Sequence, residues 1–212
     1  MRALLVVDIQ EDFLPWGALP VKSGDEVVSV ANRLLAERAR LFDFVVGTQD
    51  WNPPGHKSFA SSHKGRNVGE IINLHGIKQF LWPDHCVQRS HGADFADGLM
   101  TSQFDLVTPK GTNPDVDSYS GFFDNERRGN TGLNDWLKDR NVDHVTVLGL
   151  ATDYCVKYTV QDALLLGFKV DVVMDGCRAV NIQDGDDLRA FDFMRGEGAR
   201  LVHLKDALNS KY

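Results

Sequence analysis

The segment spanning residues 145–167 constrains the fold most, because a buried strand is followed there almost at once by a helix. Residues 145–148 form a short apolar run that ends at a glycine, a pattern typical of a buried strand. The residues after Thr152 carry apolar side chains at helical spacing, and the pattern ends at Gly167, a glycine in the position of a helix C-cap. A helix that begins near Thr152 would carry Cys155 in its first turn.

The same alternation of strand and helix patterns runs along the chain. Strand patterns occur at residues 3–7, 44–48, 104–108, 145–148, 170–174 and 200–203, with helical patterns between several of them. Ser23 and Glu26 have the spacing of a capping box, which predicts a helix that they open. Strands that alternate with helices predict an α/β fold, with a doubly wound, mostly parallel sheet and helices on both faces.

Length and local composition suggest how the chain is organised. With 212 residues the chain can bury a substantial core, and we expect one domain over residues 1–212. Residues from about 51 to 98 show weak periodicity and frequent Pro, Gly, His and Asn. Loops of this length inside a domain are usually functional, so this irregular region is predicted to contribute to metal and substrate binding.

Charge and cysteine content exclude several classes of partner. A net charge of −7 without basic runs argues against binding to nucleic acid or to an anionic membrane. The first apolar run is too short for a signal peptide or a membrane span. Three cysteines without a CxxC spacing indicate free thiols in a reducing compartment, so we expect a cytoplasmic protein. The acidic surface does not exclude a homo-oligomer.

Four residues with reactive side chains follow different predicted strands. Asp8, Asp50, Lys110 and Cys155 each lie at the carboxyl end of a strand or within a few residues of it. In parallel sheets these ends share one edge, and ligands bind in the crevice beside it. A cysteine at a helix N-terminus also faces N–H groups that favour a thiolate and can hold an oxyanion. The combination predicts an amidase with a cysteine nucleophile, a carboxylate base and a lysine that balances charge.

Each of these residues also has a purely structural interpretation. Cys155 could be a small buried hydrophobe, Asp8 could cap a turn, and Lys110 could be a solvated loop residue. The coincidence of four such residues at one edge of the sheet favours the catalytic interpretation.

The irregular region is rich in histidine. It holds His56, His63, His75, His85 and His91. Asp50, His56 and His85 offer oxygen and imidazole donors that suit zinc, iron or manganese. Because no HExxH motif or paired cysteines accompany them, spacing alone also leaves open that these histidines are solvated.

Five segments resemble the nicotinamidase/pyrazinamidase family of the cysteine hydrolases related to isochorismatase. They are RALLVVDIQEDF, TQDWNPPGHKSFASSH, WPDHCV, PKGTNPDVDSYSGFFDN and GLATDYCVKYTVQDALLLG, in the family's order and over nearly the whole chain. The resemblance implies that the chain converts nicotinamide to nicotinate and ammonia in NAD salvage, through a thioester on the cysteine. It also implies pyrazinamide as a second substrate.

The resemblance implies roles for individual residues as well. Cys155, Asp8 and Lys110 would form the catalytic triad. A cis peptide would join Leu150 to Ala151, and the N–H groups of Ala151 and Cys155 would form the oxyanion hole.

The resemblance further implies a substrate pocket beside a metal. Phe13, Trp82 and Tyr119 would form aromatic walls around the substrate. One divalent metal ion (zinc, iron or manganese) would bind the pyridine nitrogen.

One position departs from the family's pattern. Relatives usually have Asp-x-His after the second strand, where this chain has Asp50, Trp51 and Asn52. The predicted metal ligands are Asp50, Asn52, His85 and His56, with Asn52 offering an amide oxygen that is harder and weaker than imidazole. Two arrangements stay open: Asn52 binds the metal itself, or His56 binds it and Asn52 supports it by a hydrogen bond.

Three other functions also stay open at this point. A metal-free relative could act on isochorismate, a carbamoyl amide or ureidoacrylate, although Asp50, His85 and the WPDHCV segment argue against it. An intact triad argues against a non-catalytic binding module on the same fold. A missing resolving cysteine argues against a thiol redox protein.

Overall fold

The structure, a computed structural model, describes residues 1–210. Parallel strands form one six-stranded sheet in the order β5-β2-β1-β6-β7-β8. The strands are β1 Arg2–Val7, β2 Phe44–Asp50, β5 Leu106–Lys110, β6 His144–Leu150, β7 Lys169–Arg178 and β8 Arg200–Val202. The strand order reverses direction between β1 and β6, as in a doubly wound fold. The predicted parallel sheet is therefore confirmed.

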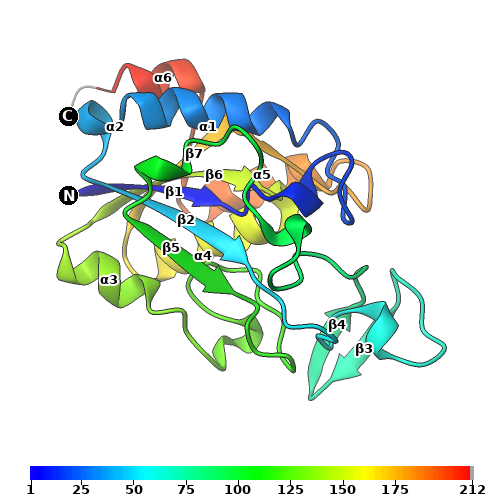
Figure 1. Cartoon of the computed structure of the whole chain (residues 1–212). Helices are drawn as coiled ribbons and strands as arrows, with labels where there is room; N and C mark the ends of the chain where they lie inside the picture. The colour runs from blue at the N-terminus through cyan, green and yellow to red at the C-terminus, as the bar shows by residue number, and fades with distance from the viewer. Residues whose placement is uncertain (211–212) are drawn as a thin grey trace.

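Helices cover both faces of the sheet (Figure 1). They are α1 Glu26–Ala36, α2 Arg38–Leu41, α3 Leu133–Asp139, α4 Lys157–Leu165, α5 Asp186–Gly196 and α6 Leu204–Leu208. α1 and α6 lie on one face, and α3 and α4 lie on the other, with α5 packed against α4. Short 3₁₀ turns lie at Glu11–Phe13, Ala60–Ser62, His91–Ala93, Thr101–Gln103 and Asn125–Arg127.

The start of α1 differs from the predicted capping box. The helix begins at Glu26, and its N-cap residue Asp25 makes no side-chain capping hydrogen bond. Ser23 has a φ of 55°, and its carbonyl accepts the N–H of Glu26 at 3.2 Å. The backbone carbonyl of Ser23, rather than its side chain, therefore accepts the N–H of Glu26 at this helix start.

β1 occupies the centre of the sheet. Ala3 to Val7 are fully buried, as expected for a strand with neighbours on both sides and helices on both faces. In the register of the sheet, Val7 lies opposite Thr48 on β2 and Gly149 on β6. This register brings the carboxyl ends of the central strands together at one edge.

Two strands extend beyond their apolar patterns to charged residues. β2 continues to Asp50 and β5 to Lys110, and these two residues lie opposite each other in the register. A charged residue can stay in a buried strand when an opposite charge lies beside it. The sequence patterns ended earlier because they count only apolar side chains.

The irregular region between β2 and β5 is ordered, with one hairpin that sequence analysis missed. β3 Ile71–Leu74 and β4 Ile77–Phe80 pair antiparallel and project away from the main sheet (Figure 1). Isolated bridges join Asn52 to Val87 and Phe59 to Trp82. These bridges return the segment after the hairpin to the edge of the sheet.

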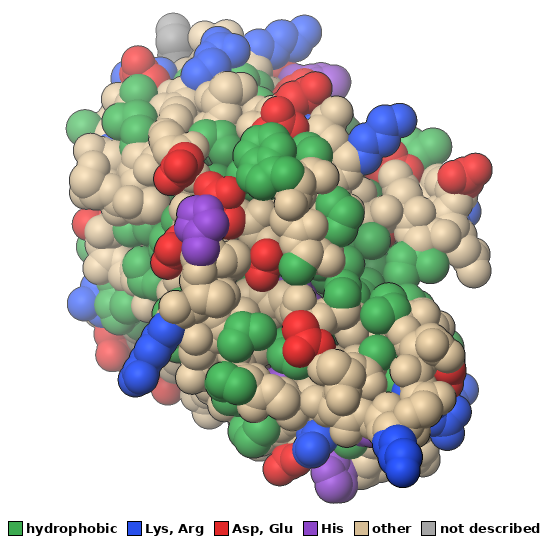
Figure 2. Space-filling model, turned by 45° about the vertical axis from the view of Figure 1, so that its right-hand side comes forward, with side chains coloured by type: hydrophobic (Ala, Val, Ile, Leu, Met, Phe, Trp, Pro, Cys, Tyr) green, Lys and Arg blue, Asp and Glu red, His purple; other side chains and the backbone are tan. Residues whose placement is uncertain are grey.

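The surface shows no sorting of side chains by type on the face that Figure 2 presents. Acidic, basic and hydrophobic side chains are interspersed there, and the outline is hollowed on the right-hand side of the view. Trp16, Ile71 and Leu188 are among the most exposed large hydrophobic residues, and they lie far apart in the sequence. Within residues 1–210, no helix has both the length and the apolar character needed to cross a bilayer.

Gly149 permits the close approach of β6 to β1. Its φ is 133°, and a Cβ at this position would lie 2.0 Å from the carbonyl oxygen of Val7. Gly149→Ala would force the two central strands apart, so we expect it to lower the free energy of unfolding by about 2–4 kcal/mol in urea titrations.

Gly167 provides a matched control for this variant. Its φ is 86°, but a Cβ at this position would have no heavy atom within 4 Å beyond its chain neighbours. Gly167→Ala should therefore lower the free energy of unfolding by about 1–2 kcal/mol, the cost of the left-handed backbone conformation for a residue with a Cβ. Equal losses in the two variants would show that contact with β1 is not what requires glycine at position 149.

Candidate active site

The ammonium group of Lys110 is the centre of a buried cluster at the edge of the sheet. Its Nζ lies 3.0 Å from Oδ2 of Asp8, 3.1 Å from Oδ1 of Asp50 and 3.5 Å from Sγ of Cys155. It also donates a hydrogen bond to the carbonyl of Ser118 at 2.7 Å. The fold thus brings together the four residues that follow different strands.

Asp8 lies directly after β1, is fully buried and has a φ of 46°. Its Oδ1 accepts a hydrogen bond from Oγ1 of Thr48 at 2.6 Å, while Oδ2 faces Lys110. Burial raises the pKa of Asp8, Lys110 opposes this rise, and repulsion from Asp50 adds to it. Because its pKa is raised, this carboxyl group is well suited to accept and return a proton.

Cys155 lies in a single π-helical turn, Thr152–Val156, that leads directly into α4. The predicted position at the start of a helix is correct, but the expected stabilisation of a thiolate is not. Burial raises the pKa of Cys155 well above its ordinary value, and the attraction of Lys110 only partly offsets this effect. The thiol is therefore neutral at rest and needs a base to become a nucleophile.

The turn before Cys155 contains the cis peptide bond expected between Leu150 and Ala151. The carbonyl of Ala151 accepts the N–H groups of Tyr154 and Val156, each at 3.1 Å. These bonds fix the backbone around the cysteine, and Ala151 and Cys155 both line the adjacent pocket.

A pocket that is partly open to solvent lies against the cysteine. It is lined by Phe13, Leu19, Asp50, Trp82, His85, Asp117, Tyr119, Ala151, Tyr154, Cys155 and Val180. The three predicted aromatic residues, Phe13, Trp82 and Tyr119, are all among them. Asp50, His85, Ala151 and Cys155 were predicted as well. Sequence analysis did not single out the remaining four lining residues, Leu19, Asp117, Tyr154 and Val180.

Aromatic side chains in the walls of this pocket contact one another. Nε1 of Trp82 donates to Oη of Tyr119 at 3.1 Å, and the ring of Trp82 meets that of Tyr154 edge-on at 4.9 Å. Phe13 lies 5.6 Å from the ring of His85. A flat aromatic ligand is the kind of molecule that such walls accommodate. The position of Tyr154, next to Cys155 in the chain, was the available sequence signal for its role.

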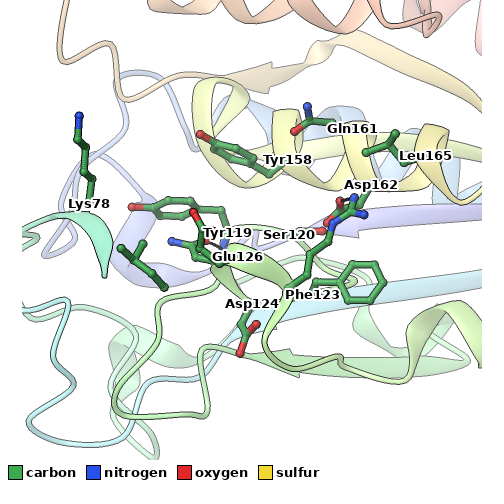
Figure 3. A pocket seen from close by; sticks show the side chains of 13 residues that line it. Lys78, Tyr119, Ser120, Phe123, Asp124, Glu126, Tyr158, Gln161, Asp162 and Leu165 are labelled. Carbon is green, nitrogen blue, oxygen red and sulfur yellow. Dashed lines mark hydrogen bonds and ion pairs between the residues drawn. The ribbon is translucent and has the colours of Figure 1, made fainter. Parts of the chain in front are cut away.

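A second depression lies on the other side of Tyr119 (Figure 3). Tyr158, Gln161 and Leu165 project into it from α4, and Tyr119 stacks on Tyr158 with ring centroids 5.3 Å apart. Its lining includes none of the residues around Lys110. Tyr158 in this depression therefore packs against Tyr119, which is part of the pocket wall. The depression itself holds none of the reactive groups.

Asp50 and His85 both line the pocket and contact each other. Nε2 of His85 lies 3.2 Å from Oδ2 of Asp50, and Nδ1 of His85 bonds to the carbonyl of Pro83. Burial would raise the pKa of Asp50, but Lys110 and His85 hold it below its ordinary value. Burial likewise opposes protonation of His85, but Asp50 outweighs it and raises the pKa of the imidazole. The pair offers one carboxylate and one imidazole to a metal ion.

Asn52 lies beside this pair but turns its amide nitrogen toward it. Nδ2 donates to Oδ2 of Asp50 and to the carbonyl of His85, each at 3.2 Å. Oδ1 is buried without a hydrogen-bond partner among the described residues and lies next to Gly111. Rotation of the amide by 180° would aim this unpaired oxygen at the pair, so Asp50, His85 and Asn52 fit a metal with oxygen-rich coordination.

The hydrogen bonds of His56 go to residues other than Asp50 and His85. Nδ1 bonds to Ser58, with Oγ at 2.8 Å, and Nε2 bonds to the carbonyl of Asn113 at 2.8 Å. The ring nitrogens of His56 thus bond to Ser58 and Asn113, whereas Nε2 of His85 faces Asp50. Of the two arrangements left open by the sequence, these contacts favour the one in which Asn52, and not His56, completes the predicted metal site. Within residues 1–210, no three His, Cys, Asp or Glu side chains form a group that could hold a metal ion.

Comparison with known proteins gives the family. The isochorismatase domain matches residues 2–206. A nicotinamidase of Escherichia coli K12 is 52% identical over 205 residues, which cover 97% of this chain and 96% of the relative. A nicotinamidase structure from Acinetobacter baumanii superimposes with a TM-score of 0.91 at 38% identity, covering 97% of both chains. A pyrazinamidase structure from Pyrococcus horikoshii in complex with zinc has a TM-score of 0.77 at 34% identity, covering 95% of this chain and 98% of the other. The chain belongs to the isochorismatase family.

Proposed function

We propose that the chain is a nicotinamidase, which hydrolyses nicotinamide to nicotinate and ammonia in NAD salvage and accepts pyrazinamide as well. The observation that carries the proposal is the contact of one buried ammonium, that of Lys110, with Asp8 and Cys155 beside an aromatic pocket. Relatives of matching length that are named nicotinamidase support nicotinamide as the substrate.

The first half of the reaction forms a thioester. Asp8 takes the proton of the Cys155 thiol, and the sulfur attacks the carboxamide carbon. The N–H groups of Ala151 and Cys155 hold the resulting oxyanion, an interaction typically worth about 3–4 kcal/mol per donor. Asp8 then gives its proton to the amide nitrogen, the C–N bond breaks, and ammonia leaves.

The second half of the reaction releases the acid. Asp8 takes a proton from a water molecule, and the hydroxide that forms attacks the thioester carbon. The C–S bond breaks, and the proton on Asp8 returns to the sulfur of Cys155. The nicotinic acid that forms gives its remaining proton to the solvent and is released as nicotinate. The raised pKa of Asp8 suits these transfers, because the group must bind and release a proton in each half of the cycle.

Lys110 reduces the repulsion among the negative charges of the site. Asp8, Asp50 and the developing thiolate would repel one another in a buried site. One ammonium in contact with all three lowers that repulsion. The lysine is thus proposed to stabilise charge rather than transfer protons.

Asp50 and His85, with the rotated amide of Asn52, are proposed to hold one divalent metal ion. When bound, such an ion acts as a Lewis acid that can orient the ring nitrogen of the substrate. A zinc complex of a related pyrazinamidase supports the presence of a metal. Four other points stay predictions: the identity of the ion, the cytoplasmic location, the formation of a homo-oligomer, and a single domain over residues 1–212.

The nucleophile is tested by Cys155→Ala. We expect ammonia release from nicotinamide to be abolished, because no other thiol lies against the pocket among the described residues. Circular dichroism and nicotinamide binding should be largely retained. Cys177→Ala, which removes another buried thiol, is the control and should keep its activity per folded molecule. Normal turnover in Cys155→Ala would refute the mechanism.

The role of Lys110 is tested through the pH dependence of kcat/KM. Asp8 acts as a base only when ionised, so activity is lost as the pH falls through its raised pKa. Lys110→Met removes the cation that opposes this rise, so the acidic limb of the profile should move to higher pH. We expect a loss of about 10²-fold or more near neutral pH. Lys64→Met, at an exposed lysine, should change neither quantity. An unshifted profile in Lys110→Met would leave the lysine without the proposed role.

Metal retention tests the ligand set. After dialysis against a chelator, metal content per chain is measured by elemental analysis. Asn52→His should bind the ion about tenfold more tightly, because imidazole replaces a weak amide ligand. His56→Ala should leave the metal content unchanged, since its ring nitrogens bond to Ser58 and Asn113 rather than to Asp50. Loss of metal in His56→Ala with no gain in Asn52→His would reverse the assignment.

A further inference from the structure

Asp117 places a carboxylate on the wall of the pocket that the proposed reaction does not use. The residue is only 6% exposed and lines the same space as Cys155, Trp82 and Tyr119. It lies in the segment between β5 and α3, seven residues beyond Lys110. A buried carboxylate in a ligand pocket calls for a chemical reason.

Neutral donors, rather than cations, hold this carboxylate in place. Oδ1 accepts the N–H of Ser118 at 2.8 Å, and Oδ2 accepts Nε2 of Gln79 on β4 at 2.8 Å. Among the described residues, no Lys, Arg or His nitrogen forms an ion pair with Asp117. Asp8 and Asp50, by contrast, share the ammonium of Lys110. Of the two carboxylates that line the pocket, Asp50 has Lys110 and His85 as ion-pair partners, and Asp117 has neither.

The field of Asp117 reaches the groups around the ligand space. Burial raises the pKa of Tyr119, and Asp117 is the next contribution in the same direction. For His85, burial lowers the pKa, but Asp50 and, to a smaller extent, Asp117 raise it. Two residues on different parts of the wall thus experience the same carboxylate.

We propose that Asp117 is a specificity-determining residue that makes the pocket discriminate against carboxylates. This inference rests on the proposed function, in which the substrate is a neutral amide and the product is an anion of nearly the same shape. A shape-complementary aromatic pocket alone would hold both. The charge on Asp117 repels only the product, so it weakens product inhibition and excludes other aromatic acids.

A structural role for Asp117 predicts a different outcome. The bond from Gln79 ties β4 to the segment that carries Tyr119. If this tie were the only purpose of Asp117, its loss would disturb amide and acid alike. The two roles are therefore separated by the ratio of two constants, the KM for nicotinamide and the inhibition constant for nicotinate.

The experiment compares this ratio in four proteins. Asp117→Asn removes the charge and keeps the shape, Asp117→Glu keeps the charge, and Gln79→Met removes the tie while the charge stays. For each, ammonia release from nicotinamide is measured at several nicotinate concentrations near neutral pH. We expect Asp117→Asn to bind nicotinate about tenfold more tightly relative to nicotinamide. The ratio should stay near that of the unmodified protein in Asp117→Glu and Gln79→Met.

Other results would overturn the inference. An unchanged ratio in Asp117→Asn, or an equal change in Gln79→Met, would assign Asp117 a structural role only. If Asp117→Asn does not fold, Asp117→Ser removes the same charge and leaves room for a water molecule beside Gln79. Failure of the proposed function is recognised separately, because the unmodified protein would then release no ammonia from nicotinamide.

Discussion

The buried ammonium of Lys110 is the interaction on which the candidate active site depends. It lies within 3.1 Å of two carboxylates and 3.5 Å from the thiol of Cys155, so it joins residues from the ends of three strands and the start of a helix. Removing one partner from such a buried cluster leaves an uncompensated charge, which typically costs about 3–5 kcal/mol. The cluster therefore couples the packing of the sheet edge to the chemistry that we propose for it.

Burial and the charge of Lys110 shift the pKa values of the acidic groups in this cluster in opposite directions. The net direction of each shift fits the role that we propose for the residue. At Asp50, the attraction of Lys110 and His85 exceeds the effect of burial, so this carboxylate, itself a proposed metal ligand, stays ionised. At Asp8 and Cys155, burial prevails and both pKa values rise. A neutral thiol beside a carboxylate with a raised pKa can exchange one proton without creating a second isolated charge. The same burial would strengthen the repulsion that we propose between Asp117 and an anionic product.

Sequence reasoning identified Asp8, Lys110, Cys155, Asp50 and His85 because each residue follows a clear signal, a strand end or a family segment. It left open whether His56 binds the metal, since spacing along a loop does not reveal that its ring nitrogens bond to Ser58 and Asn113. It also expected a stabilised thiolate, because the position of Cys155 at a helix start is visible in the sequence but its burial is not. Asp117 lay within a quoted segment, but only the fold shows that its carboxylate faces the pocket.

By itself, the sequence determined the order of strands and helices, the parallel character of the sheet and the edge at which reactive residues gather. These follow from apolar periodicity and from the rule that the carboxyl ends of parallel strands lie together. The tertiary structure alone decided which atoms meet: Lys110 with two carboxylates and a thiol, the amide nitrogen of Asn52 with Asp50, and Tyr154 with Trp82. The physical reason is that hydrogen bonds and charge interactions depend on distances of a few ångströms and on burial, and both arise only when segments distant in the sequence pack together.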